Sequence, residues 1–382
     1  MYLLLNNNKY LDQIIKCLFY CLKKNNIDSK IIYELPKKEV EEHKDEEIIE
    51  EPPKVSSLLK NVPISTEYRS DLLKNVPISN SKSKNDIFDN FKAKTGNMED
   101  LLKIANNMGD ILPKNVNLRS IAHNKNDLKV ENEDIINEQK KIKNSDVEDN
   151  STYIIFNINK IEEEDLPKNY IVYNFEQLTT DRKWNESFFE KCKKAIKVLD
   201  YSLENIKQFD LRNISAHHLP FGWCSILEPD YSLDDKDIDL LFLGSLNNNR
   251  ISTITEINRK NLGKNFYLHN KCFDDDFEKV VSKSKIGLNI HYYNGKTILE
   301  LTRIIPFICA GIHVISERSN DLYYDKIFNG IITFCRKEDM GDMVNKAISE
   351  YELSYALKKR KKLKKKLNFE NIIKENIFLF KI

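Results

Sequence analysis

Residues 284–317 contain a strand–helix–strand pattern that constrains the fold more than any other stretch of the chain. Residues 286–291 form a short, β-prone apolar run that predicts a buried strand. Residues 297–310 follow with apolar side chains at helical spacing, and Gly311 fits the position just after a helix end. Residues 312–315 form a second apolar run. A βαβ unit of this length has parallel strands and a right-handed crossover, so the sequence predicts an α/β fold.

In such a unit, ligands bind beyond the carboxyl ends of the strands. Gly295, Lys296 and Thr297 are expected to form the first turn of the helix, where free backbone amides and the positive end of the helix dipole suit a phosphate. Glu300 would then lie one turn inside the helix, with Arg303 three residues further on. The pattern alone equally allows Glu300 and Arg303 to be a solvated pair on the helix surface.

Strand and helix patterns alternate in the same way on both sides of a long polar stretch. Residues 1–35 and 151–229 are predicted to form one α/β domain, in which the first strand shares a sheet with the later ones. Residues 230–382 are predicted to form a second α/β domain that ends in helices. An acidic, polar segment at the start of that range is typical of an interdomain linker.

The polar stretch, residues 36–150, is dominated by Lys, Glu, Asp, Ser and Asn. It lacks the apolar density needed to offset the entropy of ordering, so we expect a largely disordered insertion that is dispensable for folding. The octapeptide LLKNVPIS occurs at residues 58–65 and again at residues 72–79. Two copies are too few for a solenoid. They are either a pair of linear motifs for a partner or a product of sequence slippage, and the composition favours slippage.

Composition excludes several function classes. The formal net charge is +1, which gives no whole-protein argument for a nucleic-acid or membrane partner. The seven cysteines are scattered without metal-site spacing, which indicates reduced core residues of a cytoplasmic protein. The chain shows no signal-peptide pattern and no apolar run of transmembrane length. Residues 358–366 include eight basic residues in nine, which predicts a solvated helix face or, alternatively, contact with a phosphate-rich partner or an anionic membrane surface.

Several stretches carry a resemblance to a known family. The order HLPFG, DIDLLFLGSLNNNR and KSKIGLNIHYYNGKTILELTRIIPFICAGIHVISE resembles the carboxyl-terminal domain of group 1 glycosyltransferases, which have the GT-B fold. The stretches YIIFNI, LPKNYIVYNFEQL and DYSLEN look like the amino-terminal half of a viral and bacterial branch of that family. The resemblance covers residues 1–35 and 151–350. It implies two Rossmann-like domains facing a cleft, with the long insertion in the first.

The resemblance also implies a function. Family members move a sugar from a nucleotide-sugar donor, held by the carboxyl-terminal domain, to an acceptor held by the amino-terminal domain. Glu300 matches the family glutamate that binds the donor ribose, and Gly244, Ser245 and Arg250 match the loop and basic residue that face the diphosphate. The expected donor-binding set is Gly244, Ser245, Arg250, His291, Gly295, Lys296, Thr297, Glu300 and Arg303.

The chain departs from the family pattern at one acidic position, because the earlier of two family glutamates falls near Tyr292. An alternative is therefore a degenerate fold of this kind that binds a nucleotide or a partner without turnover. A third alternative is an interaction protein whose active part is the 36–150 insertion.

The chemistry that such a site needs is limited. Backbone amides and Arg250 can stabilise a leaving diphosphate without a metal, so neither a metal nor a cofactor is expected. An inverting reaction needs a general base from the amino-terminal domain, for which His218 and Glu176 are the predicted catalytic residues and His217 is a further candidate. A retaining reaction needs no such base. The sequence names neither the sugar, the nucleotide base nor the acceptor, which is a glycan, a protein or a lipid. It predicts a cytoplasmic protein (host cytoplasm if the source is a virus) without a specific nucleic-acid partner.

Overall fold

The computed structural model describes residues 1–6, 8–35, 151–179, 184, 186–229, 233, 235–261, 263–269, 274–293 and 295–381. The predicted insertion at residues 36–150, with its two octapeptides, lies outside the described residues, as do Cys272 and Asn294.

The amino-terminal half is built on one parallel sheet of six strands. Its order is β2-β1-β3-β4-β5-β6. The strands are β1 (Tyr2–Leu5), β2 (Ser29–Ile32), β3 (Thr152–Ile155), β4 (Tyr170–Asn174), β5 (Lys197–Asp200) and β6 (Ala216–His218). Leu4 of β1 pairs with Ile31 of β2 on one side and with Ile154 of β3 on the other. The prediction that the first residues share a sheet with those beyond residue 150 is therefore confirmed.

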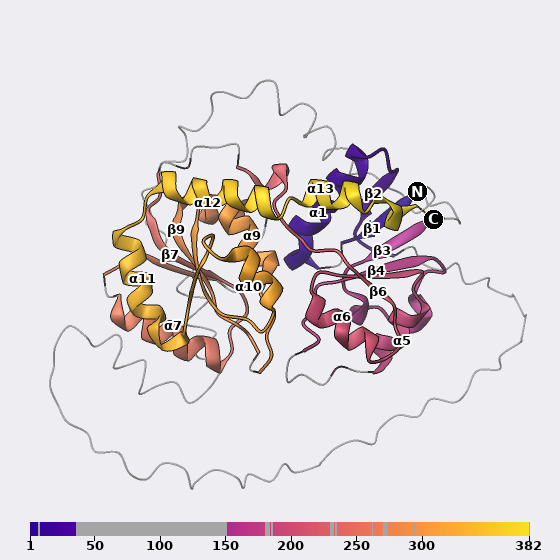
Figure 1. The fold of residues 1–382 in the computed structure, drawn as a ribbon, viewed down its shortest axis with the longest axis horizontal. Helices are drawn as coiled ribbons and strands as arrows, with labels where there is room; N and C mark the ends of the chain where they lie inside the picture. Colours follow the sequence, from indigo (N-terminus) through magenta and orange to yellow (C-terminus); the bar gives the residue numbers. More distant parts are fainter. Residues whose placement is uncertain are drawn as a thin grey trace, which may run out of the picture. The chain divides into compact units, whose positions relative to one another are not determined.

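The carboxyl-terminal half is built on a second parallel sheet, of five strands. Its order is β11-β10-β9-β7-β8. The strands are β7 (Ile238–Leu243), β8 (Phe266–His269), β9 (Ser284–Asn289), β10 (His313–Glu317) and β11 (Thr333–Cys335). β9 and β10 pair in parallel, as the βαβ pattern predicts. The predicted pair of Rossmann-like α/β sheets is confirmed (Figure 1).

Helices cover both faces of each sheet. They are α1 (Asp12–Lys24), α5 (Glu186–Lys194), α6 (Leu203–Asp210), α7 (Asn248–Lys260), α8 (Asp274–Lys283), α9 (Leu301–Cys309), α10 (Leu322–Phe328), α11 (Met340–Ser349), α12 (Leu353–Lys366) and α13 (Phe369–Glu375). In the amino-terminal half, α5 and α6 pack on one face and α1 and α13 on the other. In the carboxyl-terminal half, α7 and α11 pack on one face and α9 and α12 on the other.

The end of the chain returns to the first sheet. Trp223, which follows β6, donates its backbone N–H to Leu367 O (2.8 Å) and accepts from Phe369 N (2.7 Å). Lys24 of α1 forms an ion pair with Glu370 of α13 at 2.6 Å. The α12–α13 segment therefore ties the two halves together (Figure 1).

The described cysteines fit the prediction of reduced core thiols. Six are free, and five of these, Cys17, Cys21, Cys192, Cys224 and Cys309, are buried. Among the helices of the described residues, none has both the length and the apolar character required to span a bilayer.

Candidate active site

The best-developed polar cluster lies at the carboxyl ends of β7 and β9. The chain runs from β7 to β8 on one side of β7 and then to β9 on its other side. Ligands of open parallel sheets bind at such a switch in strand order, because the two loops that follow the strands diverge and leave a crevice. Gly244 and Ser245 follow β7, and Ile290 and His291 follow β9.

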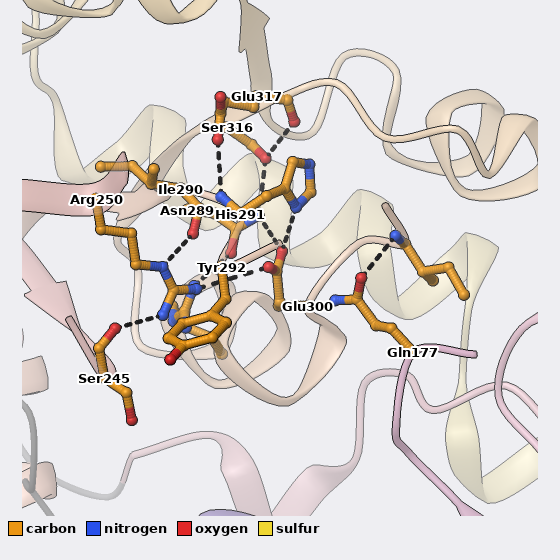
Figure 2. A network of polar contacts seen from close by, with 12 residues as sticks. Gln177, Ser245, Arg250, Asn289, Ile290, His291, Tyr292, Glu300, Ser316 and Glu317 are labelled. Carbon is orange, nitrogen blue, oxygen red and sulfur yellow. Dashed lines mark hydrogen bonds and ion pairs between the residues drawn. The ribbon is translucent and has the colours of Figure 1, made fainter. Parts of the chain in front are cut away.

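Arg250 is anchored in this crevice by the backbone. It lies in the first turn of α7, which Asn247 caps by accepting from Arg250 N at 2.9 Å. Its Nε donates to Ile290 O at 2.9 Å, and its Nη1 donates to Ser245 O at 2.7 Å. The residue is only 3% exposed. Two carbonyls therefore hold the guanidinium rigidly across the two strand ends (Figure 2).

A second guanidinium lies beside the first. Arg303 of α9 donates from Nη1 to Asn289 Oδ1 at 2.7 Å. Gly244 makes room for both arginines: a Cβ at this position would lie 2.7 Å from Arg303 Nη2 and 3.3 Å from Arg250 Nη1. Its φ of +150° also disfavours a side chain. Glycine is thus needed at residue 244 for backbone conformation and for the approach of the cations.

Glu300 faces both arginines. Its Oε1 lies 3.7 Å from Arg250 Nη2, and its Oε2 accepts from Asn289 Nδ2 at 2.9 Å. Burial alone would raise the pKa of Glu300, but the positive charges of His291, Arg303 and Arg250 hold that pKa at about 2. The carboxylate is therefore ionised, although its side chain is only 12% exposed.

His291 completes the cluster. Its Nε2 donates to Arg318 O at 3.1 Å, which places the second ring nitrogen, Nδ1, 2.9 Å from Glu300 Oε2. That contact falls outside hydrogen-bond geometry, so its effect is mainly electrostatic. Burial alone would lower the pKa of His291, but the Glu300 and Glu317 carboxylates raise it above 6.5.

The two arginines of the cluster are both held out of water. Burial lowers the pKa of Arg250 to about 9, and the neighbouring Arg303 adds to this effect. Burial also lowers the pKa of Arg303. Two crowded, desolvated guanidiniums favour an anion that can replace their lost hydration. Glu300 offsets part of this positive charge, and Glu317 also acts on Arg250.

A cavity of about 420 Å³ opens over this cluster and extends to the amino-terminal half. From the carboxyl-terminal half, its lining includes Gly244, Ser245, Arg250, Tyr292, Glu300 and Arg303. From the amino-terminal half, it includes Lys9, Tyr10, Asp12, Gln13 and Gln177. The size is within the range of small-molecule sites.

The structure brings together only part of the predicted donor set. The expected helix start at Gly295, Lys296 and Thr297 is wrong, because α9 begins at Leu301 and Glu300 is its N-cap. Side chains take the amides that a helix end would offer to a phosphate: Thr297 N donates to Asn320 Oδ1 at 3.0 Å, and Ile298 N donates to Gln177 Oε1 at 3.0 Å. Ile298 and Leu299 are also fully buried. The residues just before α9 therefore form a loop that packs in the core.

The predicted catalytic residues lie elsewhere. His218 contacts Tyr201 O through Nε2 at 3.1 Å, and burial lowers its pKa. Glu176 donates its backbone N–H to Asn174 Oδ1 at 3.1 Å, within the loop after β4. In the described part of the chain, neither residue is among those that line the cavity.

Sequence reasoning missed the residues that the amino-terminal half contributes. Asp12 opens α1, and its carboxylate accepts from Asn6 Nδ2 at 2.8 Å and pairs with Lys16 at 2.7 Å. Gln177 joins the loop after β4 to the segment before Glu300. The one available signal was the Asn-rich turn after the first strand, which marks the carboxyl end of β1. The described residues contain no cluster of three or more His, Cys, Asp or Glu side chains arranged to hold a metal ion.

Comparisons with known proteins gave only remote matches. No protein-family model and no curated protein matches the chain. Among solved structures, the chain is similar to a glycosyltransferase from Rickettsia africae ESF-5, with a TM-score of 0.48, 12% identity, and coverage of 100% of this chain and 97% of that one. It is also similar to TarM, with a TM-score of 0.41, 14% identity and coverage of 61% and 55%, so the chain spans about half the length of TarM.

A third similar structure is Anabaena HepE in complex with UDP and glucose, with a TM-score of 0.40, 9% identity, and coverage of 56% of this chain and 72% of that one. Likeness at this level carries no argument about substrate or activity. The two parallel sheets and the charged crevice of this chain are the findings on which function can be argued, and they describe a GT-B-like α/β protein.

Proposed function

We propose that the protein is a glycosyltransferase that moves a sugar from a nucleotide-sugar donor to an acceptor. One observation carries the proposal: two desolvated arginines and an ionised glutamate lie together in a cavity at the strand-order switch of the second sheet. A nucleoside diphosphate offers an anion for the arginines and ribose hydroxyls for the carboxylate. This combination fits a nucleotide-sugar better than either an inorganic anion or a neutral sugar.

The arginines would act on the leaving group. Glycosyl transfer forms a bond from the acceptor hydroxyl oxygen to the anomeric carbon and breaks the bond between that carbon and a diphosphate oxygen. The diphosphate leaves with the electron pair, and the hydroxyl proton passes to a carboxylate or to the leaving diphosphate. Arg250 is already fixed by two carbonyls, so it can stabilise that charge without reorganisation. Arg303 supplies a second cation in the same place. Two cations in this place support the proposal that the reaction proceeds without a metal ion.

The acceptor would bind against the amino-terminal half. Asp12 is the carboxylate that this half contributes to the cavity lining, and it replaces His218 and Glu176 as our candidate for holding the acceptor hydroxyl. We expect Asp12→Asn to lower the transfer rate while leaving the affinity for nucleoside diphosphate unchanged. A loss of nucleotide affinity in this variant would place Asp12 in the donor site instead.

The proposal is tested by calorimetric titration of the full chain with uridine, guanosine and adenosine diphosphates and with the parent nucleosides. Arg250→Ala should weaken diphosphate binding by roughly tenfold to a hundredfold, as expected when a charged hydrogen-bond partner is lost, and should leave nucleoside binding nearly unchanged. Arg259→Ala on the same helix is the matched control, because Arg259 is exposed and pairs only locally with Glu256 at 2.7 Å. Absence of binding to every diphosphate would refute the proposal.

A second candidate is a nucleotide-binding protein without turnover. The observation that favours it is Tyr292, whose ring centroid lies 5.2 Å from Arg250 Cζ. The family resemblance places an acid near this position. Release of nucleoside diphosphate from donor sugars separates the two candidates. If the protein binds nucleotide but releases no nucleoside diphosphate from any donor, with or without added acceptors, it is a nucleotide-binding protein without turnover.

A further inference from the structure

Helix α12 has two different long faces. Its inner face packs on the carboxyl-terminal half through Ala356 and Leu363, which are buried, and through Leu353 and Leu357, which lie against Gly311. On the other side, Figure 1 shows the helix at the edge of the described fold, and the residues of this outer face are exposed. The eight basic residues of this helix divide between the two faces.

Four of the basic residues are used by the fold. Lys359 contacts His313 Nδ1 at 2.6 Å, and Arg360 donates to Cys309 O at 2.9 Å. Lys364 lies 4.0 Å from the ring centroid of Trp223, and Lys366 donates to Ile327 O at 2.9 Å. These four contacts hold α12 against the rest of the fold.

The other four, Lys358, Lys361, Lys362 and Lys365, are exposed. Their spacing places them within one arc of the helix surface. Helix α12 contains no acidic residue, and no carboxylate of the described residues lies within ion-pair distance of these four. Each has a like-charged neighbour three or four residues away, an arrangement that destabilises a helix.

Other helices of the same chain avoid this arrangement. They pair exposed cations with acids at i,i+3 or i,i+4 spacing, in Lys193–Glu190, Lys207–Glu204, Arg259–Glu256, Lys279–Asp276 and Lys346–Glu350. The whole chain is nearly neutral, with 60 basic and 59 acidic residues, so acids are not scarce. Lys358, Lys361, Lys362 and Lys365, the lysine row of α12, are therefore a local exception. Their repulsion destabilises the helix, which indicates a partner outside the described fold.

We propose that this lysine row docks the protein on an anionic lipid surface. The row is a straight set of point charges on a convex helix edge, which suits a flat array of phosphates. The arginine of the helix, the side chain suited to bidentate recognition, is turned inward to Cys309 and Glu228. Tyr355 lies one turn before Lys358, is 51% exposed and has Lys359 Nζ 4.7 Å from its ring centroid, and an amphipathic ring of this kind is suited to the headgroup region.

Vesicle flotation tests the proposal with the full chain. We expect binding to vesicles made from equal parts phosphatidylcholine and phosphatidylglycerol, little binding to phosphatidylcholine alone, and loss of binding at high salt. Each lysine near an anionic surface accounts for about a fivefold change in partitioning. Changing Lys358, Lys361, Lys362 and Lys365 together to Gln should therefore reduce binding by roughly a hundredfold or more.

The matched control changes Lys193, Lys207, Lys279 and Lys346 together to Gln, which alters the net charge equally but breaks paired cations. It should keep vesicle binding. The α12 variant should melt at the same or a higher temperature than the wild type, because like-charge contacts are removed, whereas the control should melt slightly lower.

Equal loss of vesicle binding in both variants would overturn the proposal, since net charge alone would explain it. Stronger binding to a single-stranded oligonucleotide than to vesicles of equal phosphate content would also overturn it, in favour of a nucleic-acid partner. A lower melting temperature in the α12 variant would show that the lysines have partners within the chain. None of these outcomes depends on nucleotide binding, so they test the lipid-docking proposal independently of the glycosyltransferase proposal.

Discussion

Replacing Glu300 with Gln should affect both stability and nucleotide affinity, and the two effects can be separated. The substitution keeps the shape of the side chain but removes its charge. The carboxylate lies 2.9 Å from His291 Nδ1 and 3.7 Å from Arg250 Nη2. A neutral amide in the Glu300→Gln variant would leave those cations without their buried counter-charge.

The size of the stability effect follows from the pKa. The ordinary pKa of 4.5 falls to about 2 in the folded protein, a difference that corresponds to roughly 3 kcal/mol in favour of the ionised form. Because the folded pKa is depressed, this stability is present above pH 4.5 and is lost as the pH falls through 2. The amide retains some hydrogen bonding, so we expect about 1–3 kcal/mol of destabilisation at neutral pH. Each kcal/mol should lower Tm by about 2–4 °C.

Thermal unfolding and calorimetric titration with a nucleoside diphosphate measure the two effects on the same samples. If Glu300 binds the ribose, nucleotide affinity falls by roughly tenfold to a hundredfold in addition to the change in Tm. Glu256→Gln is the control, because Glu256 is exposed and should change stability by less than about 0.5 kcal/mol. A lower Tm with unchanged nucleotide affinity would make Glu300 purely structural. No change in either quantity would refute the electrostatic reasoning.

Three further predictions follow from the structure. Gly244→Ala should weaken diphosphate binding, because its Cβ would lie 2.7 Å from Arg303 Nη2 and its φ of +150° disfavours a side chain, and equal affinity in calorimetry would contradict the need for glycine there. The pKa of His291 is raised on folding, so its stabilising contribution is complete below pH 6.5 and is lost as the pH rises through the folded pKa. Wild type should therefore lose stability relative to His291→Gln above pH 6.5 in denaturant titrations, and parallel pH profiles would count against this. Deleting residues 1–10 should abolish cooperative unfolding of the amino-terminal half, since β1 lies between two strands, and an unchanged melting curve would argue against the sheet order.

The fold was largely predictable because it depends on local patterns. Apolar runs of strand length predicted β9 and β10 to within two residues of their observed bounds, and Gly311 occupies the predicted position after α9, with φ +70°. There, Ile312 N donates to Phe307 O at 3.0 Å, which closes the helix end.

The site was only partly predictable because its geometry depends on distant contacts. The family resemblance identified Arg250 and Glu300, and in the structure Arg250 Nη2 lies 3.7 Å from Glu300 Oε1. The start of α9 was misplaced because Gln177, 121 residues earlier, binds the amide of Ile298 and holds the preceding segment extended. No local pattern encodes such a contact. The same reason explains why Asp12 was missed: it lines the cavity with residues beyond 240, which are far from it in the sequence.

The position of β1 between β2 and β3 has a consequence for the entropy of the unfolded chain. Leu4 pairs with Ile154, so the parallel ladder of β1 and β3 forms only when the ends of a long connection meet. The entropy of closing such a loop grows as the logarithm of its length, so 115 residues between positions 35 and 151 oppose closure by only about 2 kcal/mol more than a ten-residue connection would. The insertion is therefore thermodynamically tolerable in the middle of a sheet. Its length should instead slow folding, because β1 pairs with a strand that lies about 150 residues later in the chain.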